Sequence, residues 1–101
     1  MFDYEQIKSD ENFGIKVYHN AVFKGLLVDN SRNGFGVMVY TNGRVYEGEW
    51  MSDKRHGNGF ERYSNGNKYE GQFEKGRATG KGVYIWKSGE VYDGEWKSGV
   101  K

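Results

Sequence analysis

A five-residue pattern returns along this chain at a constant step, from Tyr46 to Tyr69 and again from Tyr69 to Tyr92. The pattern reads aromatic, acidic, glycine, acidic or amide, aromatic, and a degenerate copy begins one step earlier at Phe23. A unit of this size is one supersecondary element that cannot bury its own apolar face. The units must therefore stack or pair with their neighbours, and we expect an extended repeat structure whose surface binds other molecules.

A second pattern keeps the same step as the first. It consists of two glycines separated by one residue, then an aromatic residue, and then a turn glycine. Its copies are Gly34, Gly36, Tyr40 and Gly43; Gly57, Gly59, Tyr63 and Gly66; and Gly80, Gly82, Trp86 and Gly89.

Alternation within each unit predicts β-strands. Tyr46, Gly48 and Trp50 share one face of such a strand, and Glu47 and Glu49 share the other. Asn-Gly pairs at 42–43 and 65–66 are hairpin signals, and longer turns are expected at 51–58 and 74–81. The fold class is therefore all-β: a curved single-layer antiparallel meander of about eight short strands. We place these strands near 14–18, 22–27, 36–40, 45–50, 59–63, 68–73, 82–86 and 91–96.

The combined unit resembles the MORN repeat, and residues 46–68 are the clearest copy. In residues 23–45, Leu27 stands at the Trp position and Asn33 at the His position. The resemblance implies the curved sheet of MORN-repeat hairpins, in which rings lie over glycine gaps within the strands. It divides the chain into an N-terminal arm 1–11 (a short helix or extended), a half-repeat 12–22, repeats 23–45, 46–68 and 69–91, and a partial repeat 92–101.

Composition excludes several classes of protein. The net charge of +1 lacks the basic excess that nucleic-acid binders show, and the absence of cysteine excludes disulfides and thiol chemistry. No stretch approaches the roughly 18 apolar residues of a membrane-spanning helix, and residues 1–5 lack the features of a signal peptide. We therefore expect a cytoplasmic location and no nucleic-acid partner.

No motif indicates catalysis, a cofactor or a metal site. Segment 76–82 has a gap of three residues where a phosphate-binding loop needs four, and Gly82 replaces its hydroxyl residue. His19 and His56 lack the partners of a catalytic or metal site, and His56 is expected to bond within its own turn. The acids that recur in each unit form a ladder on an open sheet face, whereas acid–base catalysis needs one isolated pair.

The aromatic ladder is the candidate binding site. Exposed aromatic surface with a polar rim marks an interaction site. We therefore expect these rings both to replace a core and to line a groove for an extended or helical segment of a partner protein. The groove residues are Tyr40, Tyr46, Trp50, Tyr63, Tyr69, Phe73, Trp86, Tyr92 and Trp96.

Two further parts of the sheet are candidate binding sites. The longer turns align along one edge, at the ends of the strands. Basic residues interspersed with acidic ones there could bind acidic phospholipid or another acidic partner. These basic residues are Lys54, Arg55, Lys75, Arg77 and Lys81. Residues 91–96 end the repeat pattern without a following strand, so we also expect edge pairing there with another chain.

The leading interpretation is a non-enzymatic protein-binding scaffold module. The MORN resemblance implies a subunit of a cytoskeletal, ciliary or membrane-junction assembly. Two alternatives stay open: a peripheral membrane adaptor that binds acidic phospholipids, and a regulatory subunit of an enzyme complex, since MORN repeats also accompany lipid-kinase and methyltransferase domains.

Overall fold

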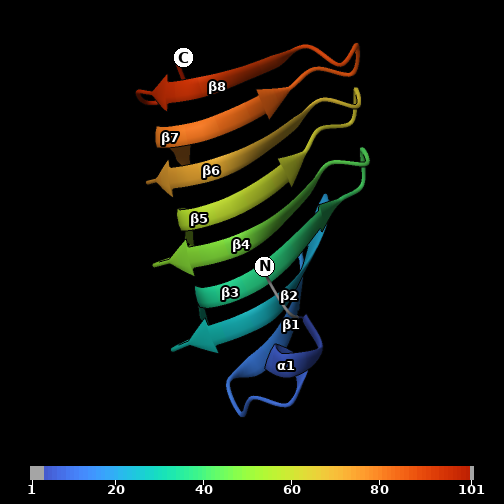
Figure 1. Cartoon of the computed structure of the whole chain (residues 1–101). Helices are drawn as coiled ribbons and strands as arrows, with labels where there is room; N and C mark the ends of the chain where they lie inside the picture. Colours follow the sequence, from blue (N-terminus) through green and yellow to red (C-terminus); the bar gives the residue numbers. More distant parts are fainter. Residues whose placement is uncertain (1–3, 101) are drawn as a thin grey trace.

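The computed structural model describes residues 4–100 as one open antiparallel sheet with a short helix beside it (Figure 1). The strand order β1 to β8 follows the chain without a crossover, which confirms the all-β meander. The helix α1 packs against β2, and residues 1–3 of the N-terminal arm lie outside the described residues. The elements are α1 Tyr4–Lys8, β1 Phe13–Val17, β2 Ala21–Val28, β3 Ser31–Tyr40, β4 Val45–Met51, β5 Lys54–Arg62, β6 Lys68–Glu74, β7 Arg77–Ile85 and β8 Val91–Trp96.

A row of glycines crosses the sheet, with one glycine from each strand paired in register with the next. Large rings lie over this row, as expected from the sequence. A Cβ atom on Gly25 would come within 2.8 Å of the Phe23 ring, and one on Gly71 within 2.7 Å of the Tyr69 hydroxyl. The glycine row is Gly14, Gly25, Gly36, Gly48, Gly59, Gly71, Gly82 and Gly94.

The core is a single layer of rings on one side of the sheet, which we call the aromatic face. Tyr46 contacts Trp50 and Phe73 edge to face, with ring centroids 5.1 and 5.2 Å apart. The polar tips are also satisfied: the Tyr46 hydroxyl donates to the Glu49 carbonyl at 2.9 Å, and Trp50 Nε1 donates to the Gly36 carbonyl at 3.3 Å. The buried core residues are Ala21, Phe23, Met38, Tyr46, Trp50, Tyr69, Phe73 and Trp96.

The expectation of long turns at 51–58 and 74–81 was wrong. β4 and β5 are joined by Ser52 and Asp53 alone, both with positive φ (50° and 69°), which is the two-residue hairpin turn that matches strand twist. The remaining residues form a bulge in β5, where residues 56–58 lie opposite Glu49 and Gly57 has φ 84°. The first glycine of each Gly-x-Gly pair therefore serves a bulge, and the second belongs to the glycine row.

The Asn-Gly hairpin turns lie where the sequence predicted them. Gly43 has φ 96° and its N–H donates to the Tyr40 carbonyl at 3.0 Å, while Asn42 Oδ1 accepts from the Arg44 N–H at 2.9 Å. Only the glycine takes the left-handed conformation, so each loop is a turn closed by a glycine bulge. These loops align at the opposite end of the strands from the two-residue turns (Figure 1).

Candidate functional site

The structure brings the nine predicted groove residues to the aromatic face but divides them into two groups. Trp50, Phe73 and Trp96, together with Tyr46 and Tyr69, are buried by contacts within the chain. The rings that keep exposed surface are Tyr40, Tyr63, Trp86 and Tyr92. The first group thus forms the core, and only the second group can contact another molecule directly.

Two of the partly exposed rings, Tyr63 and Trp86, contact Tyr84, a residue that sequence reasoning missed. Tyr63 and Tyr84 stack with centroids 5.8 Å apart, and Tyr84 lies 4.8 Å from Trp86. The Arg44 guanidinium lies 5.2 Å from the Tyr40 ring centre and 5.7 Å from that of Tyr63, so it joins these two rings. We call Tyr40, Tyr63, Tyr84 and Trp86 the outer aromatic row.

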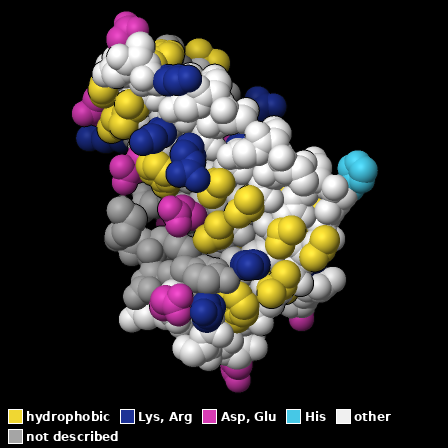
Figure 2. Space-filling model, turned by 90° about the vertical axis from the view of Figure 1, so that its right-hand side faces the viewer, with side chains coloured by type: hydrophobic (Ala, Val, Ile, Leu, Met, Phe, Trp, Pro, Cys, Tyr) yellow, Lys and Arg dark blue, Asp and Glu magenta, His cyan; other side chains and the backbone are white. Residues whose placement is uncertain are grey.

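Burial and charge distinguish this row from ordinary surface. Burial raises the pKa of Tyr63, and the nearby Glu61 carboxylate shifts it in the same direction. Figure 2, which views the molecule from the end with the Asn-Gly turns, shows hydrophobic side chains at the surface among Lys and Arg side chains. Aromatic surface beside the Arg44 guanidinium suits a ligand that offers both apolar contact and polar groups.

A buried carboxylate lies at the centre of the aromatic face. Glu61 is 1% exposed, and its two oxygens accept hydrogen bonds from Arg44 Nε and, at 2.8 Å, from Arg55 Nη1. Arg55 was expected on the basic turn edge. Because the turn before β5 has only two residues, Arg55 instead pairs with Trp50 across the strands, and its guanidinium lies 5.2 Å from the Phe73 ring centre.

Arginines clamp two of the turns, 52–53 and 75–76, each to the repeat before it. Arg32 lies 4.6 Å from the Trp50 ring centre and donates through Nη2 to the Asp53 carbonyl at 2.8 Å. Arg55 donates in the same way to the Gly76 carbonyl at 2.5 Å. A hydrogen bond from the Arg32 backbone N–H is the main cause that holds the pKa of the Asp53 carboxyl below its usual range. The signal was present in the sequence, because Arg32 and Arg55 occupy the same position in successive repeats.

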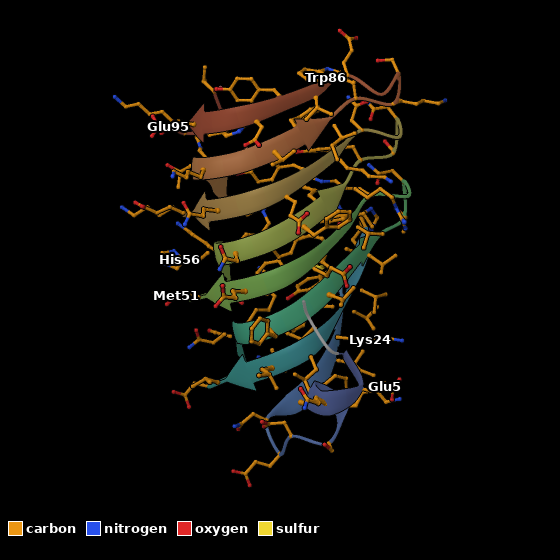
Figure 3. All side chains as sticks on the ribbon, in the orientation of Figure 1. Glu5, Lys24, Met51, His56, Trp86 and Glu95 are labelled. Carbon is orange, nitrogen blue, oxygen red and sulfur yellow. The ribbon has the colours of Figure 1, made fainter. Side chains whose placement is uncertain are left out.

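The other predicted basic residues, Lys54, Lys75, Arg77 and Lys81, are exposed. Lys54 and Arg77 directly follow two-residue turns, and Lys75 lies within one. Figure 3 shows Met51 and His56 at that end of the strands and Trp86 at the other, so the turn cations lie far from Trp86. The exposed acids Asp29 and Glu74 share this edge with them.

The opposite side of the sheet, which we call the second face, was expected to be a solvated face with a ladder of acids. It does carry Glu47 and Glu70, but it is also apolar around β1 to β3. Ile15 is 57% exposed, Val17 77% and Val39 48%. The described chain therefore has exposed apolar surface on both sides of its single layer.

Within residues 4–100, no cluster of three or more potential metal-ligating side chains is present. The only described helix has five residues, and no helix of this part of the chain is long and apolar enough to cross a membrane.

Sequence comparison relates the repeat architecture to known proteins. No curated protein matches the chain. A family model for the MORN repeat matches it four times, at residues 23–43, 46–68, 69–91 and 92–101. Those matches cover most of the sheet, and the chain belongs to the MORN repeat family.

Proposed function

We propose that the chain is a non-enzymatic protein-binding module that holds a segment of a partner protein along the outer aromatic row and Tyr92. The observation that carries this proposal is the outer aromatic row, in which Tyr63, Tyr84 and Trp86 contact one another and Arg44 links Tyr40 to Tyr63. These rings stay partly exposed although the rings beside them are buried. Tyr and Trp supply large contact area at low cost in conformational entropy, and they dominate interface energetics.

The buried groove residues support binding indirectly. Trp50 and Phe73 hold the sheet together, so truncating them is expected to unfold the site before it reveals any contact. The outer rings are therefore the ones whose truncation reports on binding itself.

The proposal is tested by identifying proteins that co-purify with the native chain and titrating the leading one against variants. Trp86→Ala and Tyr63→Ala are each expected to weaken binding by about 30-fold, which corresponds to about 2 kcal/mol. Val17→Ala, on the second face and at the other end of the sheet from β8, is the control and is expected to bind normally. A folded Trp86→Ala that binds as tightly as the unaltered chain would refute the proposal.

For the cellular setting, we propose a cytoplasmic role as a subunit of a cytoskeletal, ciliary or membrane-junction assembly. A partner strand is proposed to pair with β8, which is an edge strand of the described sheet. Protection of the amides of 91–96 from exchange in the native assembly, compared with the isolated chain, tests this pairing.

The exposed turn cations favour a second candidate, a peripheral adaptor for acidic phospholipids. Lys54, Lys75 and Arg77 lie along one edge, where each could gain about 1 kcal/mol from an anionic surface. Co-sedimentation with phosphatidylserine vesicles tests it. Salt-sensitive binding that Lys54→Ala with Lys75→Ala abolishes, and that Trp86→Ala leaves unchanged, would favour the membrane function over the protein-binding one.

A further inference from the structure

The second face contains a hollow of about 400 Å³ that crosses the strands in the middle of the sheet. Its floor is the backbone of the glycine row, and its walls are side chains of the two flanking rows. The described residues that line it are Phe35, Glu47, Gly48, Glu49, Asn58, Gly59, Phe60, Glu70 and Gly71. The hollow thus extends from β3 to β6, on the side of the sheet away from the aromatic face.

One wall of the hollow alternates acidic and aromatic side chains. Glu47 pairs across the strands with Phe60, and Phe60 pairs with Glu70. The backbone positions of Glu47 and Glu70 are therefore two strand spacings apart, about 9.6 Å. Glu49 has a different role, because its Oε2 accepts the N–H of the bulge residue Asn58 at 2.6 Å.

The charges around the hollow are unbalanced. Neither Glu47 nor Glu70 forms an ion pair in the described structure, and no Lys or Arg is among the described residues of the lining. Arg62 and Lys68 are cross-strand neighbours, two residues further along β5 and β6 from Phe60 and Glu70. They are not among the residues that line the hollow. The hollow therefore combines two phenylalanine rings with two carboxylates that form no ion pair, which complements an apolar segment that carries cations.

We propose that this hollow binds a polyproline II segment with lysine or arginine at every third residue. The backbone N–H and C=O groups of β4 and β5 are already paired within the sheet, so a ligand across them must need no backbone hydrogen bonds. Polyproline II has no internal hydrogen bonds, and it repeats every three residues, about 9.3 Å. Same-side residues of an extended strand lie about 6.8 Å apart and do not fit this spacing.

The fit places two cations and an apolar residue on known groups. Cations three residues apart meet Glu47 and Glu70, and the prolines between them pack on Phe60, as proline-rich segments do on aromatic grooves. The hollow crosses three strand gaps, about 14 Å, which accommodates about five residues at about 3.1 Å each. This surface is separate from the outer aromatic row, so a second partner, or a second segment of the same partner, can bind there.

The test uses three peptides with uncharged, blocked termini. Each is titrated into the intact chain, and binding is followed by NMR chemical shifts. Lys-Pro-Pro-Lys-Pro has the proposed spacing, Lys-Pro-Lys-Pro-Pro has the same composition with the cations two residues apart, and Glu-Pro-Pro-Glu-Pro has the opposite charge. The first peptide is expected to bind at least about fivefold more tightly than either of the others, with shifts centred on Gly48, Gly59 and Gly71. Equal binding of the first two, binding of the acidic peptide, or shifts centred on Tyr63 and Trp86 would each overturn the proposal.

Charge removal gives an independent test. Glu47→Gln combined with Glu70→Gln is expected to weaken Lys-Pro-Pro-Lys-Pro about five- to tenfold, in line with the modest energies of exposed ion pairs. Asp29→Asn with Glu90→Gln removes the same charge away from the hollow and is expected to leave binding unchanged. Because Glu47 and Glu70 have no ion-pair partner, the first variant should keep the melting temperature of the unaltered chain, and an equal loss of binding in both variants would refute the site.

Discussion

Replacing glycines of the glycine row tests whether the rings and strands pack as closely as the structure indicates. A Cβ atom on Gly48 would come within 2.5 Å of Gly59 Cα and 2.6 Å of the Asn58 carbonyl oxygen. Both are backbone atoms of the neighbouring strand, which can move only if β4 and β5 separate. At Gly14, in the same row, a Cβ would meet Leu27 Cδ1 at 2.6 Å, and the next Leu27 atom lies at 3.6 Å.

The different surroundings of Gly14 and Gly48 determine how much each alanine substitution should change the free energy of unfolding. Neither glycine has positive φ, so alanine at either site gains about 0.4–1 kcal/mol by restricting the unfolded chain. The Leu27 methyl can rotate away, so Gly14→Ala should stay within about 0.5 kcal/mol of the unaltered chain. Overpacking against the backbone should make Gly48→Ala less stable by about 2–3 kcal/mol, which lowers Tm by about 8–24 °C for a domain of this size.

Urea unfolding followed by far-ultraviolet circular dichroism, together with thermal melting, measures both variants. Gly48→Val should destabilise the sheet at least as much as Gly48→Ala, because it adds further atoms at the same contact. If Gly48→Ala and Gly14→Ala had equal unfolding free energies, the close approach of the strands at the glycine row would be refuted.

Two further predictions concern hydrogen bonding and pH. Glu49→Gln should leave stability unchanged, because Gln72 already fills the equivalent position and accepts the N–H of Lys81 at 3.0 Å. Glu49→Leu should cost about 1–2 kcal/mol in urea unfolding, because it leaves the Asn58 N–H without its acceptor; an unchanged Glu49→Leu would contradict this. Burial raises the pKa of Tyr46 and Tyr63 above the ordinary value of 10.0, so the unfolded chain loses these protons first. The free energy of unfolding should therefore stay constant up to about pH 9 and decrease above pH 10. A free energy of unfolding that increased across this range would refute the burial of the two hydroxyls.

Features that depend on local spacing were predictable from the sequence. The strands, the Asn-Gly turns and the packing of rings over glycines follow from alternation and from glycine chemistry. The turns at 52–53 and 75–76 were missed because the bulge glycines Gly57 and Gly80 were interpreted as turn residues, although Ser52 and Asp53 themselves take positive φ. The error lengthened the predicted turns and hid the fact that the Arg55 guanidinium lies on the aromatic face beside Glu61 and Phe73.

Features that depend on register between repeats were not predictable in the same way. The sequence indicates that Glu61 shares a face with Tyr63, but its contacts with Arg44 and Arg55 depend on how β4 and β5 align. The division of the aromatic residues into buried and exposed rings also depends on three-dimensional packing. Trp50 and Trp86 have similar chemistry, yet only Trp50 lies beneath neighbouring side chains.

The charged cluster at Glu61 has a counterpart one repeat later in which all three residues differ. Arg44, Arg55 and Glu61 correspond, at the repeat step, to Asn67, Ala78 and Tyr84. Asn67 Nδ2 donates to the Tyr84 hydroxyl at 3.0 Å, where Arg44 donates to Glu61 in the earlier repeat. The centroid of the Tyr84 ring lies 5.8 Å from that of Trp96, the aromatic residue one repeat step after Phe73. In each of the two three-residue clusters, the polar side chains are therefore hydrogen-bonded within the cluster and the side chains match one another in size.

These residues should therefore exchange only as a set. Tyr84→Glu alone buries a carboxylate without an arginine and should cost about 2–4 kcal/mol. Adding Asn67→Arg and Ala78→Arg rebuilds the earlier cluster, and the triple variant should be more stable than the sum of its single changes by about 1–3 kcal/mol, the range of coupling between residues in one network. Unfolding free energies of the singles, the doubles and the triple measure this coupling. Strict additivity would show that the two clusters are not interchangeable units, because each arginine would then contribute independently of the carboxylate.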